Sequence, residues 1–159
     1  NATQSAAKIQ PKSSTAQNQL GLIYSRLGET DKALSSFTKA QKLDPLFPDP
    51  HFNKGNLLLK KGKYSESVNS FKATLDLNDQ HIDAIANLGL ALERCNDWKG
   101  ASKAYDRAIS INPKHVDANW NKSLLLLKKG KYLEGFRLFE WRWKTPQLKG
   151  GIRNFLQPL

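Results

Sequence analysis

The segment NKGNLLLKKGKY at residues 53–64 returns nearly unchanged as NKSLLLLKKGKY at residues 121–132. The two copies lie 68 residues apart, which is twice 34, and segments 19–30 and 87–98 occupy the other positions of the same 34-residue period. A fixed period of this size is typical of proteins that stack small repeated units, each packed mainly on its neighbours. The period therefore predicts an elongated stack and not a single globular core.

Four units align on this period: unit one at 14–47, unit two at 48–81, unit three at 82–115, and a shorter unit four at 116–145. The eighth and twentieth places hold small residues, which recur where two helices approach closely, and the twenty-fourth holds an aromatic that fills the gap between them. In chain order these are Gly21, Gly55, Gly89 and Ser123, then Ala33, Ser67, Ala101 and Gly135, then Phe37, Phe71, Tyr105 and Phe139.

The fifteenth place of each unit holds a residue that readily adopts the left-handed conformation at the end of a helix. These residues are Gly28, Gly62, Asn96 and Gly130. Each unit is therefore predicted to be a helix, a tight turn and a second helix. The first helices are expected at about 14–27, 48–61, 82–95 and 116–129, and the second helices at about 30–43, 64–77, 98–111 and 132–144.

This pattern resembles the tetratricopeptide repeat family, whose consensus runs W-x2-L-G-x2-Y…A-x3-F…P. The matching residues are Leu20, Gly21, Tyr24, Ala33, Phe37 and Pro45 in unit one, and Leu88, Gly89, Ala101, Tyr105 and Pro113 in unit three. Units two and four carry Lys54 and Lys122 where leucine is usual. The resemblance covers about residues 14–145. It implies an all-α fold, an α-solenoid that forms a right-handed superhelix whose first helices line a concave groove.

The two ends of the chain depart from the complete repeat. Residues 1–13 are predicted to be the stub of a truncated preceding repeat, because Ala6 and Pro11 lie one period before Ala40 and Pro45; a disordered tail is the alternative. Residues 146–159 have Pro and Gly but no clear period, and are expected to be an exit linker. The chain contains no Met, which favours a piece of a longer protein.

The end of unit four carries bulky residues in unusual places. Arg142 stands where the earlier units have a small residue, which indicates that no ordinary fifth unit follows. Phe136, Phe139 and Trp143 share one face of the expected last helix. Trp141 lies off that face, either as a lone surface aromatic or as a docking contact for a following domain.

The run GFRLFEWRW and the linker after it resemble the junction in bacterial proteins that carry tetratricopeptide repeats ahead of a glycosyltransferase-like domain. This resemblance implies that a catalytic domain would begin just after Leu159 and could be an intramolecular partner of the repeats. No catalytic residue can be assigned from it, so this chain itself is not expected to be an enzyme.

The sixth places form a ladder of amide side chains: Gln19, Asn53, Asn87 and Asn121. An amide offers both a donor and an acceptor, so it can pair with a peptide backbone of any sequence. The ladder resembles the asparagine ladder in the repeats of the eukaryotic O-linked N-acetylglucosamine transferase. In the alternative interpretation, these amides tie helices together by hydrogen bonds.

The thirteenth places form a basic ladder: Arg26, Lys60, Arg94 and Lys128. These cations can pair with carboxylates or phosphates of a bound chain, or they can simply complement the negative helix ends. Asn56 is a further candidate. Asn56 and Asn87 occupy the two Asn places of the clamp with which one subset of the family binds chaperone tails, but Phe52 replaces its first lysine, so that activity is not expected.

The net charge of +11 favours an acidic partner, and we expect an extended, acidic protein or peptide segment. Nucleic acid is favoured by charge alone and is not expected, and no apolar run is long enough for a membrane span. The lone Cys95 favours a reducing, cytoplasmic compartment and is expected to be a small buried thiol. His81 and His115 occupy equivalent turns, too far apart for one metal, and no cofactor motif is present.

Overall fold

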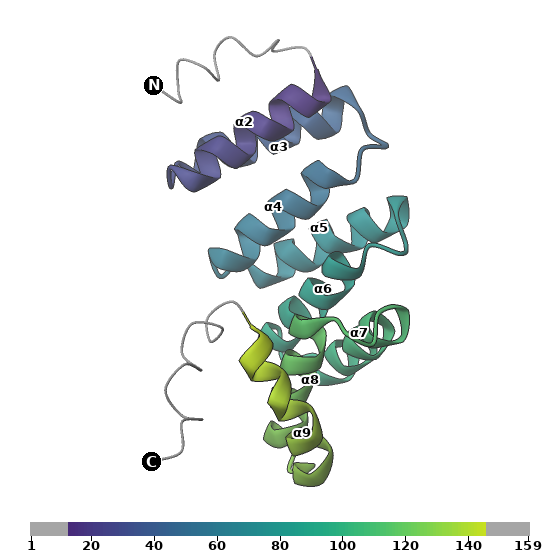
Figure 1. Cartoon of the computed structure of the whole chain (residues 1–159). Coiled ribbons are helices and arrows are strands. Elements are labelled where there is room, and N and C mark those ends of the chain that lie inside the picture. The colour runs from purple at the N-terminus through teal and green to yellow at the C-terminus, as the bar shows by residue number, and fades with distance from the viewer. Residues whose placement is uncertain (1–12, 146–159) are drawn as a thin grey trace, which may run out of the picture.

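The computed structural model describes residues 13–145, which form a stack of helical hairpins. The elements are α2 (Ser14–Arg26), α3 (Thr30–Leu43), α4 (Asp49–Lys60), α5 (Tyr64–Leu77), α6 (Ile82–Arg94), α7 (Trp98–Ile111), α8 (Val116–Lys128), α9 (Tyr132–Phe139) and the 3-10 helix η1 (Glu140–Lys144). The hairpins follow one another from α2 and α3 at one end to α8 and α9 at the other (Figure 1). The predicted all-α solenoid is confirmed. Apart from Ser13, the predicted stub and exit linker lie outside the described residues.

The turn inside each hairpin has the predicted left-handed residue. The backbone φ angle is 78° at Gly28, 77° at Gly62, 63° at Asn96 and 73° at Gly130. A residue in this conformation reverses the chain directly after the helix, because its amide can bond back to the last turn. The helix boundaries accordingly fall within one residue of those expected, with the exception of the last helix.

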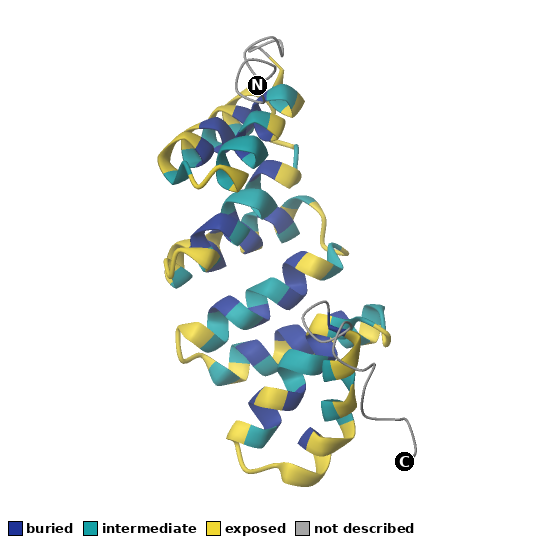
Figure 2. Cartoon of the chain, turned by 60° about the vertical axis from the view of Figure 1, so that its left-hand side comes forward, coloured by how far each residue is buried: buried dark blue, intermediate teal, exposed yellow. Residues whose placement is uncertain are grey.

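The small and aromatic places meet inside each of the first three hairpins. A Cβ atom added to Gly89 would lie 2.5 Å from the ring of Tyr105, and one added to Gly21 would lie 2.5 Å from the ring of Phe37. Phe37, Phe71 and Tyr105 are fully buried. Buried residues occur in helices along the whole stack (Figure 2). The recurring pair of a small residue and an aromatic therefore sets the close packing of each hairpin.

Unit four packs differently. Ser123 carries the Cβ and hydroxyl that the glycines lack, and Phe139 is only half-buried. The Phe139 ring instead packs on Trp120, with 5.3 Å between their centroids. The expected last helix also ends early, at Phe139, and the chain continues as η1.

The predicted continuation of the last α-helix to residue 144 is wrong, because residues 140–144 form η1, which has 3.0 residues per turn and not 3.6. Phe136 and Trp143 are exposed by 59% and 37%, whereas Trp141 is half-buried. The Arg142 guanidinium lies 4.2 Å from the ring centroids of both Phe139 and Trp143. A bulky cation therefore occupies the place at which Ala40, Thr74 and Ala108 allow the next unit to pack.

The seventh place of the units alternates between leucine and lysine, although every junction also buries apolar residues. At the junction of units two and three, Leu88 packs with Val68, Ala84 and Ala91 in an apolar cluster. Leu88 is the seventh residue of unit three. The seventh residues of units two and four are Lys54 and Lys122, and their ammonium groups contact polar side chains of the preceding unit. The 68-residue duplication thus corresponds to a lysine at the seventh place of every second unit. Within residues 13–145, no helix combines the length and the apolar character needed to cross a membrane.

Candidate functional site

The first helices of successive units, α2, α4, α6 and α8, lie next to one another along the concave side of the stack. Two hydrogen bonds join these helices directly. Asn53 Nδ2 donates to Asn18 Oδ1 at 3.0 Å, and Asn87 Nδ2 donates to Asn56 Oδ1 at 2.8 Å. Two rungs of the predicted amide ladder therefore bridge neighbouring helices. Because Asn53 and Asn87 are only half-buried, each still presents an amide oxygen and a second N–H.

The two end rungs of the amide ladder make no such bridge. Gln19 is exposed and Asn121 is half-buried, and neither is hydrogen-bonded within the described part of the chain. The buried amide of unit four is Asn119, which donates to the carbonyl oxygens of Pro113 at 3.0 Å and His115 at 2.8 Å. Among the described residues, the two middle rungs of the amide ladder therefore bridge first helices, whereas the two end rungs do not.

The basic ladder is also uneven. Arg26, Lys60 and Arg94 are exposed, and none of them forms an ion pair within residues 13–145. Lys128 differs, because its ammonium lies 3.9 Å from the Trp98 ring centroid and 3.9 Å from Glu93 Oε1. Exposed contacts of this kind contribute at most about 1 kcal/mol each. Three cations are therefore available to a partner, and the fourth is partly engaged.

Glu93 is a groove residue that sequence reasoning missed. Its Oε2 accepts a hydrogen bond of 3.3 Å from the hydroxyl of the buried Tyr105. Burial, and next the negative charge of Glu93, raise the pKa of Tyr105 far above its ordinary range. Tyr105 therefore remains a neutral donor, and Glu93 adds one negative charge beside the basic ladder. The signal for Glu93 in the sequence was an acidic residue at the twelfth place of unit three, where the other units have Ser25, Leu59 and Leu127.

His81 and His115 have a structural role in this fold. His81 Nδ1 accepts from the backbone N–H of Ala84 at 3.2 Å, and His115 Nδ1 accepts from that of Ala118 at 3.1 Å. Both therefore cap the N-termini of first helices, as expected of equivalent repeat positions. Within the described residues, no group of His, Cys, Asp and Glu side chains could hold a metal ion.

The expectation of a buried thiol is wrong, because Cys95 is exposed. Helix α6 ends at Arg94, so Cys95 is its C-cap and lies beyond the packed part of the helix. Its sulfur lies 3.8 Å from Ser65 Oγ. Arg94 and Cys95 line an open hollow of about 410 Å³ beside the turn that joins α4 to α5.

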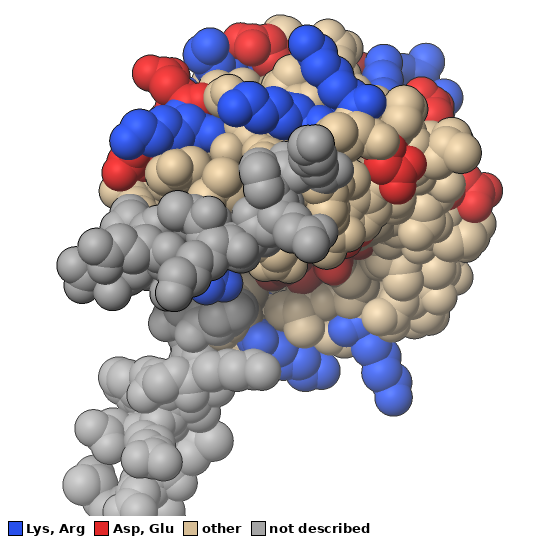
Figure 3. Space-filling model, turned by 90° about the horizontal axis from the view of Figure 1, so that it is seen from above, with Lys and Arg blue, Asp and Glu red and all other residues tan. Residues whose placement is uncertain are grey.

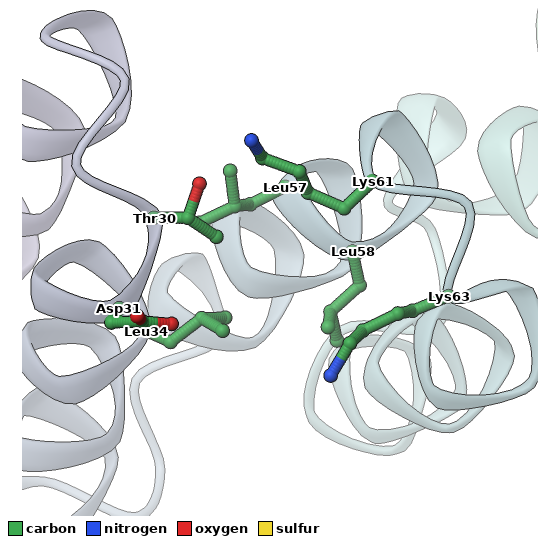
Figure 4. Close-up of a pocket in the computed structure, with 7 residues that line it drawn as sticks. All are labelled: Thr30, Asp31, Leu34, Leu57, Leu58, Lys61 and Lys63. Carbon is green, nitrogen blue, oxygen red and sulfur yellow. The ribbon is translucent and has the colours of Figure 1, made fainter.

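A separate hollow of about 250 Å³ lies between α3 and α4. It is lined by Thr30, Asp31, Leu34, Leu57, Leu58, Lys61 and Lys63. In Figure 4 the ammonium groups of Lys61 and Lys63 point to opposite sides of the hollow, away from each other. None of the site residues predicted from the two ladders lines it, so it is not part of the concave groove.

Comparison of the sequence with family models gives three matches, each described as a tetratricopeptide repeat. They cover residues 14–47, 48–81 and 82–115, which together exceed half of the chain. A sequence search of functionally characterised proteins gives no match.

Several solved structures share the fold. MamA superposes with a TM-score of 0.78 at 22% identity, covering 92% of this chain and 86% of MamA. YrrB, described as a repeat protein with an unusual peptide-binding site, gives 0.74 at 21% identity, covering 92% of this chain and 76% of YrrB. The first repeat domain of Spaghetti (RPAP3), bound to the HSP90 peptide SRMEEVD, gives 0.72 at 19% identity, covering 77% of this chain and 97% of that domain. At these identities the similarity concerns the fold, and together with the three consecutive matches it shows that the chain belongs to the tetratricopeptide repeat family.

Proposed function

We propose that this chain is a protein-interaction module that holds an extended, acidic protein segment in its concave groove. The observation that carries the proposal is the arrangement of half-buried amides, at Asn53, Asn87 and Asn121, beside cations on the same first helices that form no ion pair within residues 13–145. The cations are Arg26, Lys60 and Arg94. Amides would pair with the backbone of the bound segment and cations with its carboxylates.

The bridges between helices support this role. An Asn that donates one N–H to its neighbour keeps its oxygen and its second N–H, and its side-chain rotamer is held in place. Less conformational entropy is then lost when a peptide binds. Asn56, which accepts the bond from Asn87, belongs to the same site because its oxygen orients that amide.

The similarity to peptide-bound repeat domains agrees with an acidic ligand. The peptide bound by the Spaghetti domain, SRMEEVD, carries three carboxylate side chains. The present chain lacks the lysine that the chaperone clamp places at Phe52, so we propose an acidic segment of a different sequence. The net charge of +11 on this chain favours rapid association with such an acidic segment at low ionic strength.

The test uses a fluorescent peptide of alternating glycine and glutamate, whose binding is followed by anisotropy. Changing both Asn87→Ala and Asn121→Ala is expected to weaken binding about tenfold, at unchanged helical content. Asn121→Ala alone is the cleaner variant, because Asn121 makes no hydrogen bond within the described residues. The matched control is Gln80→Ala, an exposed amide in the turn between α5 and α6. Equal binding by the wild type and the double variant would overturn the proposal.

A second candidate function is that these repeats are the substrate-recruiting arm of a bacterial glycosyltransferase. The observation that favours it is the exposed apolar surface at the end of the stack, formed by Tyr132, Leu133, Phe136 and Trp143. A following domain would cover this surface. Sequencing the parent gene beyond Leu159 tests the proposal, and an ordinary repeat array or a stop codon there would exclude it.

A further inference from the structure

Two junctions of the stack place a lysine opposite the same position of the preceding unit. At the junction of units three and four, the Lys122 ammonium on α8 pairs with the Asp106 carboxylate on α7. At the junction of units one and two, the equivalent residues are Lys54 on α4 and Thr38 on α3, and their Nζ and Oγ1 atoms are 3.5 Å apart. In both junctions the partners are separated by 16 residues. The junction of units one and two therefore repeats that of units three and four, with a neutral hydroxyl in place of the carboxylate.

Within residues 13–145, no ion pair therefore compensates the charge of Lys54. Lys54 is half-buried, and a partly desolvated ammonium is costly unless an anion pairs with it. A hydroxyl at 3.5 Å lies at the outer limit of a hydrogen bond and carries no charge. The neighbouring His51 is affected by this environment, because burial and next the charge of Lys54 lower the pKa of the imidazole.

Lys54 lies where two hollows of about 430 and 350 Å³ meet. Both hollows are lined by Lys54, Leu58 and Glu66, and the larger one also by Thr38, Lys39 and Lys42. We call this region of α3, α4 and α5 the basic furrow. Its one carboxylate, Glu66, already pairs with Lys63 at 3.4 Å. Seen from the α2 and α3 end, most Lys and Arg side chains in view lie on one side of the molecule, where Asp and Glu side chains lie among them (Figure 3).

We propose that the basic furrow binds an acidic segment of a partner protein, one carboxylate of which contacts Lys54 as Asp106 contacts Lys122. Lys39 and Lys42 flank that position and would pair with adjacent carboxylates. The site is formed by α3, α4 and α5 and does not use the residues of the amide or basic ladders. It is thus a second binding surface, independent of the concave groove.

The other junctions show why this site is specific to units one and two. At the junction of units two and three, the seventh place holds Leu88, which packs in an apolar cluster. At the junction of units three and four, Asp106 already occupies the anion position. There the equivalent of Lys39 is Arg107, whose guanidinium donates to the backbone oxygen of Asp79. Within residues 13–145, only the first junction combines the lysine, the missing carboxylate and flanking lysines without an ion pair.

The experiment introduces the missing carboxylate into the full chain. Thr38→Asp is expected to close the site with an internal ion pair, and Thr38→Asn is the matched control, of similar size but uncharged. The ligand is acetyl-hexaglutamate amide, and the readout is the side-chain NMR signals of the lysines during titration. The expected result is saturable perturbation of the Lys54 signals in the wild type and in Thr38→Asn, with at least about tenfold weaker binding to Thr38→Asp.

Three other outcomes would overturn the proposal. These are unchanged binding by Thr38→Asp, equal loss in both Thr38 variants, and no perturbation of Lys54 in the wild type. Inorganic phosphate is titrated separately into the complex with the peptide. Displacement of the peptide by phosphate at a concentration equal to that of the peptide would show that the furrow binds small anions only. The variant Lys60→Ala with Arg94→Ala separates the two surfaces. If it abolishes binding while Thr38→Asp does not, the peptide occupies the concave groove, and only the furrow proposal fails.

Discussion

Asn87 on α6 and Asn56 on α4 are joined by a side-chain hydrogen bond of 2.8 Å, which ties the first helices of units three and two. Asn87→Ala removes this bond and is expected to lower the free energy of unfolding by about 1 kcal/mol, a typical net value for one hydrogen bond. Urea denaturation followed by circular dichroism measures the change. Asn121→Ala is the control, because Asn121 makes no such bond in the described residues, and its expected effect is within about 0.5 kcal/mol. Equal losses in both variants would contradict a bridging role for Asn87.

Phe71 is fully buried between the helices of unit two. Phe71→Ala is expected to lower the free energy of unfolding by about 3–5 kcal/mol, since it removes a whole ring and leaves a cavity. Chemical denaturation measures the loss. Phe136→Ala provides the comparison, because 59% of that residue is exposed and its removal leaves no enclosed cavity. A loss below about 1 kcal/mol for Phe71→Ala would be inconsistent with full burial.

Gly89 packs directly against Tyr105, and an added Cβ would lie 2.5 Å from the ring. Gly89→Ala is expected to destabilise the protein, because overpacking costs about 1–3 kcal/mol and offsets the better helix propensity of alanine. The measurement is a double-mutant cycle with Tyr105→Ala. In that background the ring is absent, so Gly89→Ala is expected to be neutral or stabilising. The same destabilisation in both backgrounds would show that the ring is not the cause.

The stability of the fold is expected to decrease at alkaline pH through Tyr105. Burial and the charge of Glu93 raise its pKa in the folded protein above the ordinary value of 10.0. The unfolded chain therefore loses this proton first, and the contribution of Tyr105 to stability is complete below pH 10.0 and decreases as the pH rises above it. Comparison of wild type and Tyr105→Phe by urea denaturation between pH 8 and 11 isolates the effect, because other groups titrate equally in both. A constant difference between the two proteins across that range would contradict the raised pKa.

Periodicity in the sequence predicted the helices and their turns because both depend on local features. A residue able to adopt positive φ ends each first helix, as Gly62 and Asn96 do, and the small and aromatic places define which faces meet. The last helix was mispredicted because its continuation as η1 changes the number of residues per turn. The face shared by Phe136 and Trp143 holds only for a continuous α-helix.

Side-chain partners across units were less predictable than the helices. The ladders of equivalent residues suggested equal rungs, yet Lys128 contacts Trp98 and Glu93, while Arg26 and Lys60 form no ion pair with any residue that the structure describes. Such pairing depends on the residues that happen to lie within reach of a long side chain, and a repeat consensus does not encode it. The basic furrow had a visible signal, since Lys54 and Lys122 both replace leucine. Comparison of the residues 16 positions earlier would have shown Thr38 opposite one and Asp106 opposite the other.

The alternation of leucine and lysine at the seventh place of the units also has a mechanical consequence. Units two and three meet through Leu88 in an apolar cluster, whereas each outer junction carries a lysine at the corresponding place. In a linear array, stability is a sum of terms for single units and for neighbouring pairs. Under tension applied to the two ends of the chain, the outer hairpins are therefore expected to detach before the central two separate. The stack would lengthen in steps as the outer units detach, and units two and three would be the last to separate.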